Sequence, residues 1–211
     1  MSIVTCHVSM SLDGFVAGPN QSAKNPAGAG GMRLFQWVFA SKAWHEHQGR
    51  EGGEETVDCP VIEEVVDGIG AYIMGRHMFG GGDGPWDESW RGWWGEEPAF
   101  HAPVFVLTNH PRKPLRMRGG TTFTFVTEGI KSALEQGRQA AGEQAVSIAG
   151  GAETMRQFLA AGLLDELYVH LVPVVLGEGE RLLLNVGDPT LELVKVVPSP
   201  KATHIKYRII C

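Results

Sequence analysis

The stretch VSIAGGAETM, residues 146–155, combines the signals that decide the fold. Val146 to Ala149 is a short apolar run typical of a buried strand, Gly150-Gly151 ends it, and a helical pattern follows. Paired glycines between a strand and a helix let a ligand approach the backbone, and the helix N-terminus offers free N–H donors to an anion. A tight turn explains the same glycines, and the full G-x-G-x-x-G pattern is absent.

Similar units extend on both sides of this stretch. The apolar runs that we predict as strands lie at residues 3–10, 71–74, 104–107, 122–127 and 167–175. Because such runs alternate with helical patterns, they specify a parallel sheet covered on both faces. The runs 191–197 and 203–210 predict an antiparallel hairpin at one edge. We expect one α/β domain over residues 1–211, with three layers and a mostly parallel central sheet of about eight strands.

Composition narrows the classes of function. The 18 basic and 24 acidic residues give a net charge of −6, which argues against nucleic acid or an anionic membrane as the main partner. The three cysteines lie far apart, and no motif has the spacing of zinc ligands, so we expect neither a disulfide scaffold nor a metal site. Reduced thiols, together with the lack of a long apolar stretch, predict a cytoplasmic protein without a membrane helix.

Two further strand ends carry groups suited to a phosphorylated ligand. Gly75-Arg76 follows one predicted strand, and Leu107-Thr108-Asn109 follows another, with Arg112 and Lys113 shortly after. Guanidinium and hydroxyl groups bind phosphate oxygens. A surface arginine that caps a turn, or a solvated basic loop, explains each site separately. Since the carboxyl ends of parallel strands meet at one edge of a sheet, we expect these sites and Gly150-Gly151 to line one crevice.

The tryptophans are unevenly placed. Trp86, Trp90, Trp93 and Trp94 make four of the 6 tryptophans and lie beside a glycine-rich segment. Such a segment can stack on a flat heterocycle, form a subunit contact, or pack as a small aromatic core under a long loop.

Six short motifs follow one another along most of the chain. They are MSLDGFVA (10–17), IMGR (73–76), VLT (106–108), AGGA (149–152), LDEL (164–167) and PVVLGEG (173–179). In their order and spacing they resemble the dihydrofolate reductase fold, and most closely the reductase domain of the bifunctional riboflavin-biosynthesis deaminase/reductase.

The resemblance implies an NADPH-dependent reductase that transfers a hydride to a small heterocyclic or carbonyl/imine substrate. The positions that it assigns to the cofactor are Gly75, Arg76, Leu107, Thr108, Asn109, Arg112, Ala149, Gly150, Gly151, Ala152, Leu176 and Gly177. The positions that it places beside the substrate are Leu12, Asp13, Gly14 and Phe15.

Asp58 is the candidate catalytic acid. It precedes Gly75 at about the distance at which folate reductases carry a carboxylate for the pterin ring. Burial beside aromatic rings would raise the pKa of such a carboxyl group into the range of a useful acid.

Several functions stay open. The first is reduction of 5-amino-6-(5-phosphoribosylamino)uracil or a similar compound, and the alternatives are dihydrofolate reductase activity, a non-catalytic nucleotide-binding module and an oligomeric interaction protein. Because related reductases dimerise, we expect a homodimer. Its interface would bury part of the apolar run 167–175 and of the Trp86–Trp94 segment.

Overall fold

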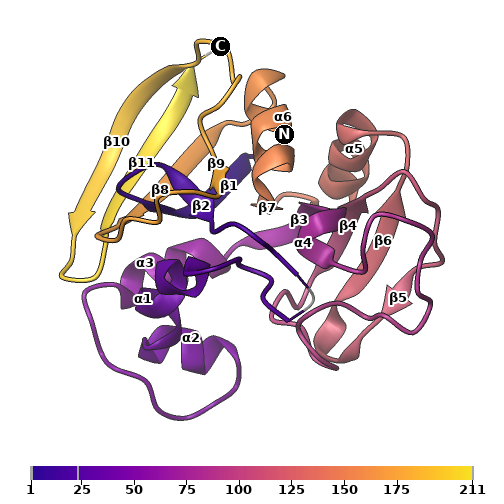
Figure 1. Ribbon diagram of the computed structural model, residues 1–211, viewed down its shortest axis with the longest axis horizontal. Coiled ribbons are helices and arrows are strands. Elements are labelled where there is room, and N and C mark those ends of the chain that lie inside the picture. The colour runs from indigo at the N-terminus through magenta and orange to yellow at the C-terminus, as the bar shows by residue number, and fades with distance from the viewer. Residues whose placement is uncertain (1, 23, 211) are drawn as a thin grey trace.

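The structure is a computed structural model that describes residues 2–22 and 24–210, and its centre is a sheet of nine strands in the order β10-β11-β8-β1-β7-β3-β4-β6-β5 (Figure 1). Six neighbouring strands run parallel. They are β8 (Glu166–Val172), β1 (Val4–Ser11), β7 (Ala145–Gly150), β3 (Ile69–Gly75), β4 (Pro103–Leu107) and β6 (Thr122–Val126). Their apolar composition matches burial on both faces.

Antiparallel strands complete both edges of the sheet. At one edge, β11 (Thr203–Ile210) pairs with β8, and β10 (Thr190–Pro198) is outermost. At the other edge, the short strand β5 (Leu115–Arg116) pairs with β6. The expected fold class is confirmed, including the C-terminal hairpin, while β5 was not predicted from the sequence. A separate two-stranded sheet joins β2 (Phe15–Ala17) to β9 (Glu180–Arg181).

Helices cover the two faces of the sheet in different ways. On one face, α5 (Ile130–Ala141) and α6 (Ala152–Ala160) pack their apolar sides on Val4, Ile73 and Ile148. On the other face lie a group of short helices and a long Trp-rich loop, which we define as residues 80–102. The short helices are η1 (Gly31–Phe35), α1 (Gln36–Phe39), α2 (Lys42–His47), α3 (Cys59–Val66) and α4 (Arg76–Phe79); η2 (Arg118–Gly120) lies between β5 and β6.

The apolar run 167–175 corresponds to β8 and the residues just after it. β8 lies between β11 and β1, and its side chains Leu167, Tyr168 and Val169 are buried. These three side chains therefore cannot form a subunit interface, whereas Val175, beyond the end of β8, is exposed, and the expected dimer stays a prediction. Among the described residues, no helix has the length and apolar character needed to cross a membrane.

Candidate functional site

A cleft of about 800 Å³ opens at the carboxyl ends of the parallel strands. The ends of β3, β4, β6 and β7 form its floor together with the middle of β1. Nine of the residues that the sequence assigned to a cofactor line it. They are Gly75, Arg76, Leu107, Thr108, Asn109, Ala149, Gly150, Gly151 and Ala152. The expected convergence of separate strand ends on one crevice is present in the structure.

Gly150 and Gly151 play different parts at one end of the cleft. Gly150 has a φ of +130°, and a Cβ there would lie 3.0 Å from the Met78 sulfur. Gly151 has an ordinary φ of −70°, and a Cβ there would meet no atom within 4 Å. Gly151 therefore needs no positive φ, unlike Gly150. Its lack of a side chain leaves open space in the cleft directly beside the N-terminus of α6.

Two helices of substantial length begin at this end of the cleft. The lining includes Ala152 and Thr154 in the first turn of α6 and Gly129 and Ile130 at the start of α5. Within the part of the chain that the structure describes, no side chain caps the first N–H groups of either helix. Free N–H donors and the positive end of the helix dipole suit an anionic ligand.

Gly75 permits the close packing of β3 against α6. A Cβ at Gly75 would lie 2.5 Å from the Thr154 hydroxyl oxygen. Arg76, the next residue, is buried and donates from Nε to the Gly82 carbonyl oxygen at 2.6 Å and from Nη2 to the Gly84 carbonyl oxygen. Its guanidinium also lies 3.8 Å from the centre of the Trp86 ring. Arg76 therefore holds the Trp-rich loop, and its Nη1 has no partner among the described residues.

The residues of the basic segment after β4 do not all face the cleft. Thr108 and Asn109 line the cleft, and the Thr108 hydroxyl oxygen accepts a hydrogen bond from the His110 backbone N–H at 3.1 Å. Arg112 lies outside the lining, with a fully buried side chain that donates to the carbonyl oxygens of Glu88 at 3.0 Å and Trp90 at 2.7 Å. Arg112 thus binds the Trp-rich loop instead of facing the ligand space.

The predicted substrate segment Leu12–Phe15 and the predicted cofactor pair Leu176-Gly177 contact each other outside the cleft. The Asp13 carboxylate accepts hydrogen bonds from the backbone N–H groups of Leu176 at 3.1 Å and Gly177 at 2.7 Å. The Ser11 hydroxyl and these amides lower the pKa of Asp13 to about 2. This turn supports β2, whose Val16 and Ala17 do line the cleft.

Bulky side chains surround the other end of the cleft. Met32, Phe35 and Phe39 reach it from η1 and α1, and Trp93 and Trp94 reach it from the Trp-rich loop. His7 and Ser9 of β1 lie beneath them. Trp37, on the same short helix as Phe39, donates from its indole nitrogen to the Ser9 hydroxyl oxygen at 3.0 Å, which fixes this wall on the sheet.

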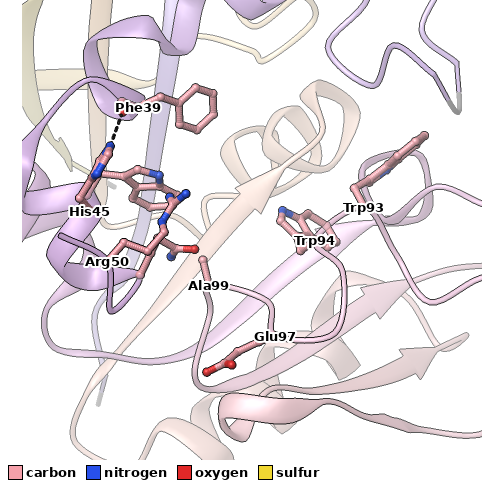
Figure 2. A pocket seen from close by; sticks show the side chains of 9 residues that line it. Phe39, His45, Arg50, Trp93, Trp94, Glu97 and Ala99 are labelled. Carbon is pink, nitrogen blue, oxygen red and sulfur yellow. Dashed lines mark hydrogen bonds between the residues drawn. The ribbon is translucent and has the colours of Figure 1, made fainter. Parts of the chain in front are cut away.

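A smaller pocket of about 400 Å³, which we call the annex, adjoins this end. It shares Phe39, Trp93 and Trp94 with the cleft. Figure 2 shows Phe39, His45 and Arg50 on one side of the annex and the two tryptophans on the other. His45 is fixed between the carbonyl oxygens of Phe39 and Glu51, each at 3.2 Å.

Asp58 does not line the cleft. It lies at the N-terminus of α3 with 1% of its surface exposed, and its Oδ1 is 2.8 Å from Nε2 of His204. The His204 Nδ1 is in turn 2.9 Å from the Nδ1 of His170. A direct contact between Asp58 and a ligand in the cleft is not compatible with this position.

Several lining residues were missed by sequence reasoning. Thr127, Gly129 and Ile130 could have been found, because they join a predicted strand to a predicted helix as Gly150-Gly151 does in the next strand–helix unit of the sequence. His7 and Ser9 carried no such signal, since they alternate with apolar residues inside a strand. The glycine- and proline-rich loop 18–31 contributes Gln21, Pro26 and Ala27 to the lining.

Several proteins of known structure share this architecture. No curated protein matches the sequence significantly. Among solved structures, a protein of Shewanella sp. PV-4 assigned to riboflavin biosynthesis has a TM-score of 0.61 and 19% identity, with 99% of each chain covered. Dihydrofolate reductase of Enterococcus faecalis, complexed with NADP(H), has a TM-score of 0.56 and 14% identity over 98% of this chain and 96% of that one.

The diaminohydroxyphosphoribosylaminopyrimidine deaminase/5-amino-6-(5-phosphoribosylamino)uracil reductase of Thermotoga maritima has a TM-score of 0.57 and 13% identity. The match covers 99% of this chain but 57% of that protein. At these identities the likeness establishes the fold. The RibD C-terminal domain family matches residues 2–205, almost the whole sequence. The chain therefore belongs to the RibD C-terminal domain family.

Proposed function

We propose that this chain is an NADPH-dependent reductase that transfers a hydride to a C=N or C=O bond of a small heterocyclic substrate. Membership of the RibD C-terminal domain family supports the reductase role. The observation that carries the proposal is the open space beside Gly151, at a place where two uncapped helix N-termini face one cleft.

The glycine-rich end of the cleft fits the nucleotide part of NADPH. Gly150, Gly151 and Ala152, with the N-terminus of α6, would hold the diphosphate through backbone N–H groups. Thr108 and Asn109 would contact the 2′-phosphate, and the N-terminus of α5 lies close by in the same lining. Arg112, Leu176 and Gly177 are not part of this assignment, because their contacts are with the protein.

The cofactor supplies the hydride when bound, so the protein must hold the substrate against the nicotinamide and exclude water. With the diphosphate at Gly151, the nicotinamide would extend toward β1 and β2, where Ala17, His7 and Ser9 line the cleft. Phe35, Phe39, Trp93 and Trp94 would cover the substrate. Their flat rings suit a heterocycle, and the annex offers room for a substituent.

Thermal unfolding with NADPH, NADH and AMP tests the cofactor assignment. A ligand at about 100 times its dissociation constant should add roughly 2.7 kcal/mol to the free energy of unfolding. Consumption of NADPH with 5-amino-6-(5-phosphoribosylamino)uracil, dihydrofolate and simpler imines then tests turnover. Binding of NADPH without turnover on any of them would favour the non-catalytic module, and the lack of any stabilisation by NADPH would contradict the proposal.

We further propose that the protein is a cytoplasmic homodimer joined through β10. This outermost strand exposes the apolar side chains of Leu191, Leu193, Val194 and Val196. Val194 is 45% exposed and Val196 is 49% exposed. An exposed apolar edge strand favours pairing with a second copy. The buried free thiols of Cys6 and Cys59 support a reducing compartment.

A further inference from the structure

A buried row of polar side chains runs from Asp58 to His170, whose ring stacks on that of His7 in the floor of the cleft. Asp58 and His204 are 2.8 Å apart between Oδ1 and Nε2, and His204 and His170 are 2.9 Å apart between their Nδ1 atoms. All three are buried, with exposed fractions of 1%, 0% and 3%. They come from α3, β11 and β8, so only the folded sheet brings them together.

The hydrogen bonds fix where the protons lie. When Asp58 is ionised, His204 donates from Nε2 to the carboxylate, and its bare Nδ1 accepts from the Nδ1–H of His170. The Nε2 of His170 is then bare. Burial, reinforced by His7 and His204, lowers the pKa of His170 well below its usual value, so this ring is neutral. The row therefore holds one negative charge, on Asp58, and ends in an acceptor at His170.

That acceptor is one of three neighbouring buried polar atoms that have no hydrogen-bond partner among the described residues. They are Nε2 of His170, the hydroxyl of Tyr168 and Nδ1 of His7. The ring centres are 4.8 Å apart for Tyr168 and His170, 5.6 Å for His7 and Tyr168, and 6.2 Å for His7 and His170. Leaving such atoms without a hydrogen bond destabilises the folded protein. A buried water commonly makes about three hydrogen bonds to groups of this kind.

We propose that one water joins these three groups, and that the row Asp58–His204–His170 stores a proton and delivers it to the cleft through His7. This inference rests on the proposed reductase function. In the loaded state Asp58 is protonated, His204 carries its proton on Nδ1, and His170 carries its proton on Nε2.

Delivery moves one proton at each step. The Nε2 proton of His170 passes through the water to Nδ1 of His7, and the Nε2 proton of His7 passes to the nitrogen or oxygen of the substrate bond. That bond has by then accepted a hydride from NADPH at its carbon, so substrate, hydride and proton give the reduced product and NADP⁺. Protons then shift from His204 to His170 and from Asp58 to His204, which leaves Asp58 ionised until solvent reloads the row.

The charges around His7 favour this neutral relay over a stored imidazolium. Burial and the Lys206 ammonium lower the pKa of His7 to about 4, while Glu64 acts in the opposite direction. Lys206 on β11 pairs with Glu64 on α3 at 3.1 Å and with Glu166 on β8 at 2.8 Å. Because each ring gains one proton as it loses another, no ring needs to be charged.

Trp37 shields the row from solvent. Its ring centre lies 4.7 Å from those of both His170 and His204. The same side chain bonds to Ser9 beneath the cleft. The short helix that walls the substrate space thus also fixes the two imidazoles in place.

Nitrogen-15 NMR of histidine-labelled protein tests the row without any turnover. Near pH 8 we expect His204 protonated on Nε2 and His170 on Nδ1, and when the pH is lowered while the protein stays folded, both rings should reverse tautomer together and stay neutral. In Asp58→Asn, which keeps the oxygen acceptor but cannot store a proton, the reversal should be lost. An imidazolium at either position, or tautomers that do not change over this range, would overturn the proposal.

Single-turnover kinetics with NADPH tests delivery. Asp58→Asn should slow proton-coupled reduction by about 100-fold while the dissociation constant of NADPH stays within about twofold. The matched control is Asp67→Asn, an exposed aspartate that ends the same helix, and it should leave both quantities unchanged. An unaltered rate in Asp58→Asn would refute delivery. If the native protein never oxidises NADPH, the reductase proposal fails, and the NMR result still decides the proton storage.

Discussion

At the end of the cleft that we propose for the nucleotide, the walls are glycines and helix N-termini, whereas at the end proposed for the substrate they are large side chains from segments far apart in the sequence. Gly75, Gly150 and Gly151 stand at the ends of neighbouring parallel strands. Phe39, Trp93 and His7 come from a short helix, a long loop and the middle of a strand. The first end offers backbone groups to a ligand, whereas the contacts at the second end are made by side chains.

This difference between the two ends indicates which contacts in the cleft depend on the identity of particular side chains. The fold itself supplies the backbone donors at the strand ends, so the proposed nucleotide end would be compatible with many different substrates. The substrate end depends on which helix and which loop are laid over β1, and Trp37, Arg76 and Arg112 fix that arrangement. We therefore expect substitutions at the two ends to have separable effects.

Gly151→Val should have the largest effect. Its side chain would fill the open space at the nucleotide end without disturbing the fold, because φ is −70° and no atom lies within 4 Å of the new Cβ. We expect NADPH binding to weaken by more than about 100-fold, since several charged hydrogen bonds would be lost. Calorimetric titration measures this.

The matched control is Gly84→Val, which also places a Cβ in open space but outside the cleft. It should leave NADPH affinity unchanged. Native affinity in Gly151→Val would mean that the glycine pair is a turn and nothing more.

Arg112→Met should cost about 3 kcal/mol of unfolding free energy, because the buried guanidinium loses its bonds to the carbonyl oxygens of Glu88 and Trp90. Urea denaturation measures the loss. The matched control is Arg91→Met, at an exposed arginine of the Trp-rich loop, and it should lower the free energy of unfolding by less than about 0.5 kcal/mol. A stable Arg112→Met with weak NADPH binding would restore Arg112 as a cofactor ligand.

Acidification should destabilise the substrate end. The pKa of His7 falls to about 4 in the folded protein from a usual 6.5, and the pKa of His170 is also lowered. Below pH 6.5 the unfolded chain binds protons that the folded chain does not. The free energy of unfolding therefore decreases by about 1.4 kcal/mol for each group when the pH is lowered by one unit within this range.

Urea midpoints measured near pH 7 and pH 5 in the native protein and in His7→Gln test this dependence. The variant should show a smaller slope. An equal slope in both proteins would show that His7 titrates normally.

Thr108→Val should weaken NADPH about 10-fold and leave NADH unaffected, because the hydroxyl would contact the 2′-phosphate alone. Competition of the two cofactors in one assay supplies the internal control. Equal losses for both would place Thr108 against another part of the nucleotide.

Leu193→Glu should have the smallest effect on the cleft, because β10 is remote from both of its ends in the sheet order. We expect a monomer by light scattering and unchanged NADPH affinity. A dimer that persists in this variant would remove β10 from the interface.

The glycine-rich end of the cleft could be predicted from the sequence because its signals are local. A strand, a glycine and a helix start follow one another within a few residues at Gly75 and at Gly150. Asp58 was correctly noticed but wrongly placed, since its partner His204 is 146 residues away and no local pattern specifies that pairing. The prediction that Arg112 faces the ligand could not be corrected from the sequence for a similar reason. The Trp-rich loop folds back onto Arg112, and its carbonyl oxygens accept the hydrogen bonds of the guanidinium.

A crystal structure of the protein with NADP⁺ tests the central claim most directly. The account predicts the diphosphate against Gly150, Gly151 and Ala152, and the nicotinamide beside His7 and Ser9 under Phe39 and Trp93. A nicotinamide at the α5 end of the cleft, or NADP⁺ bound elsewhere on the protein, would contradict it.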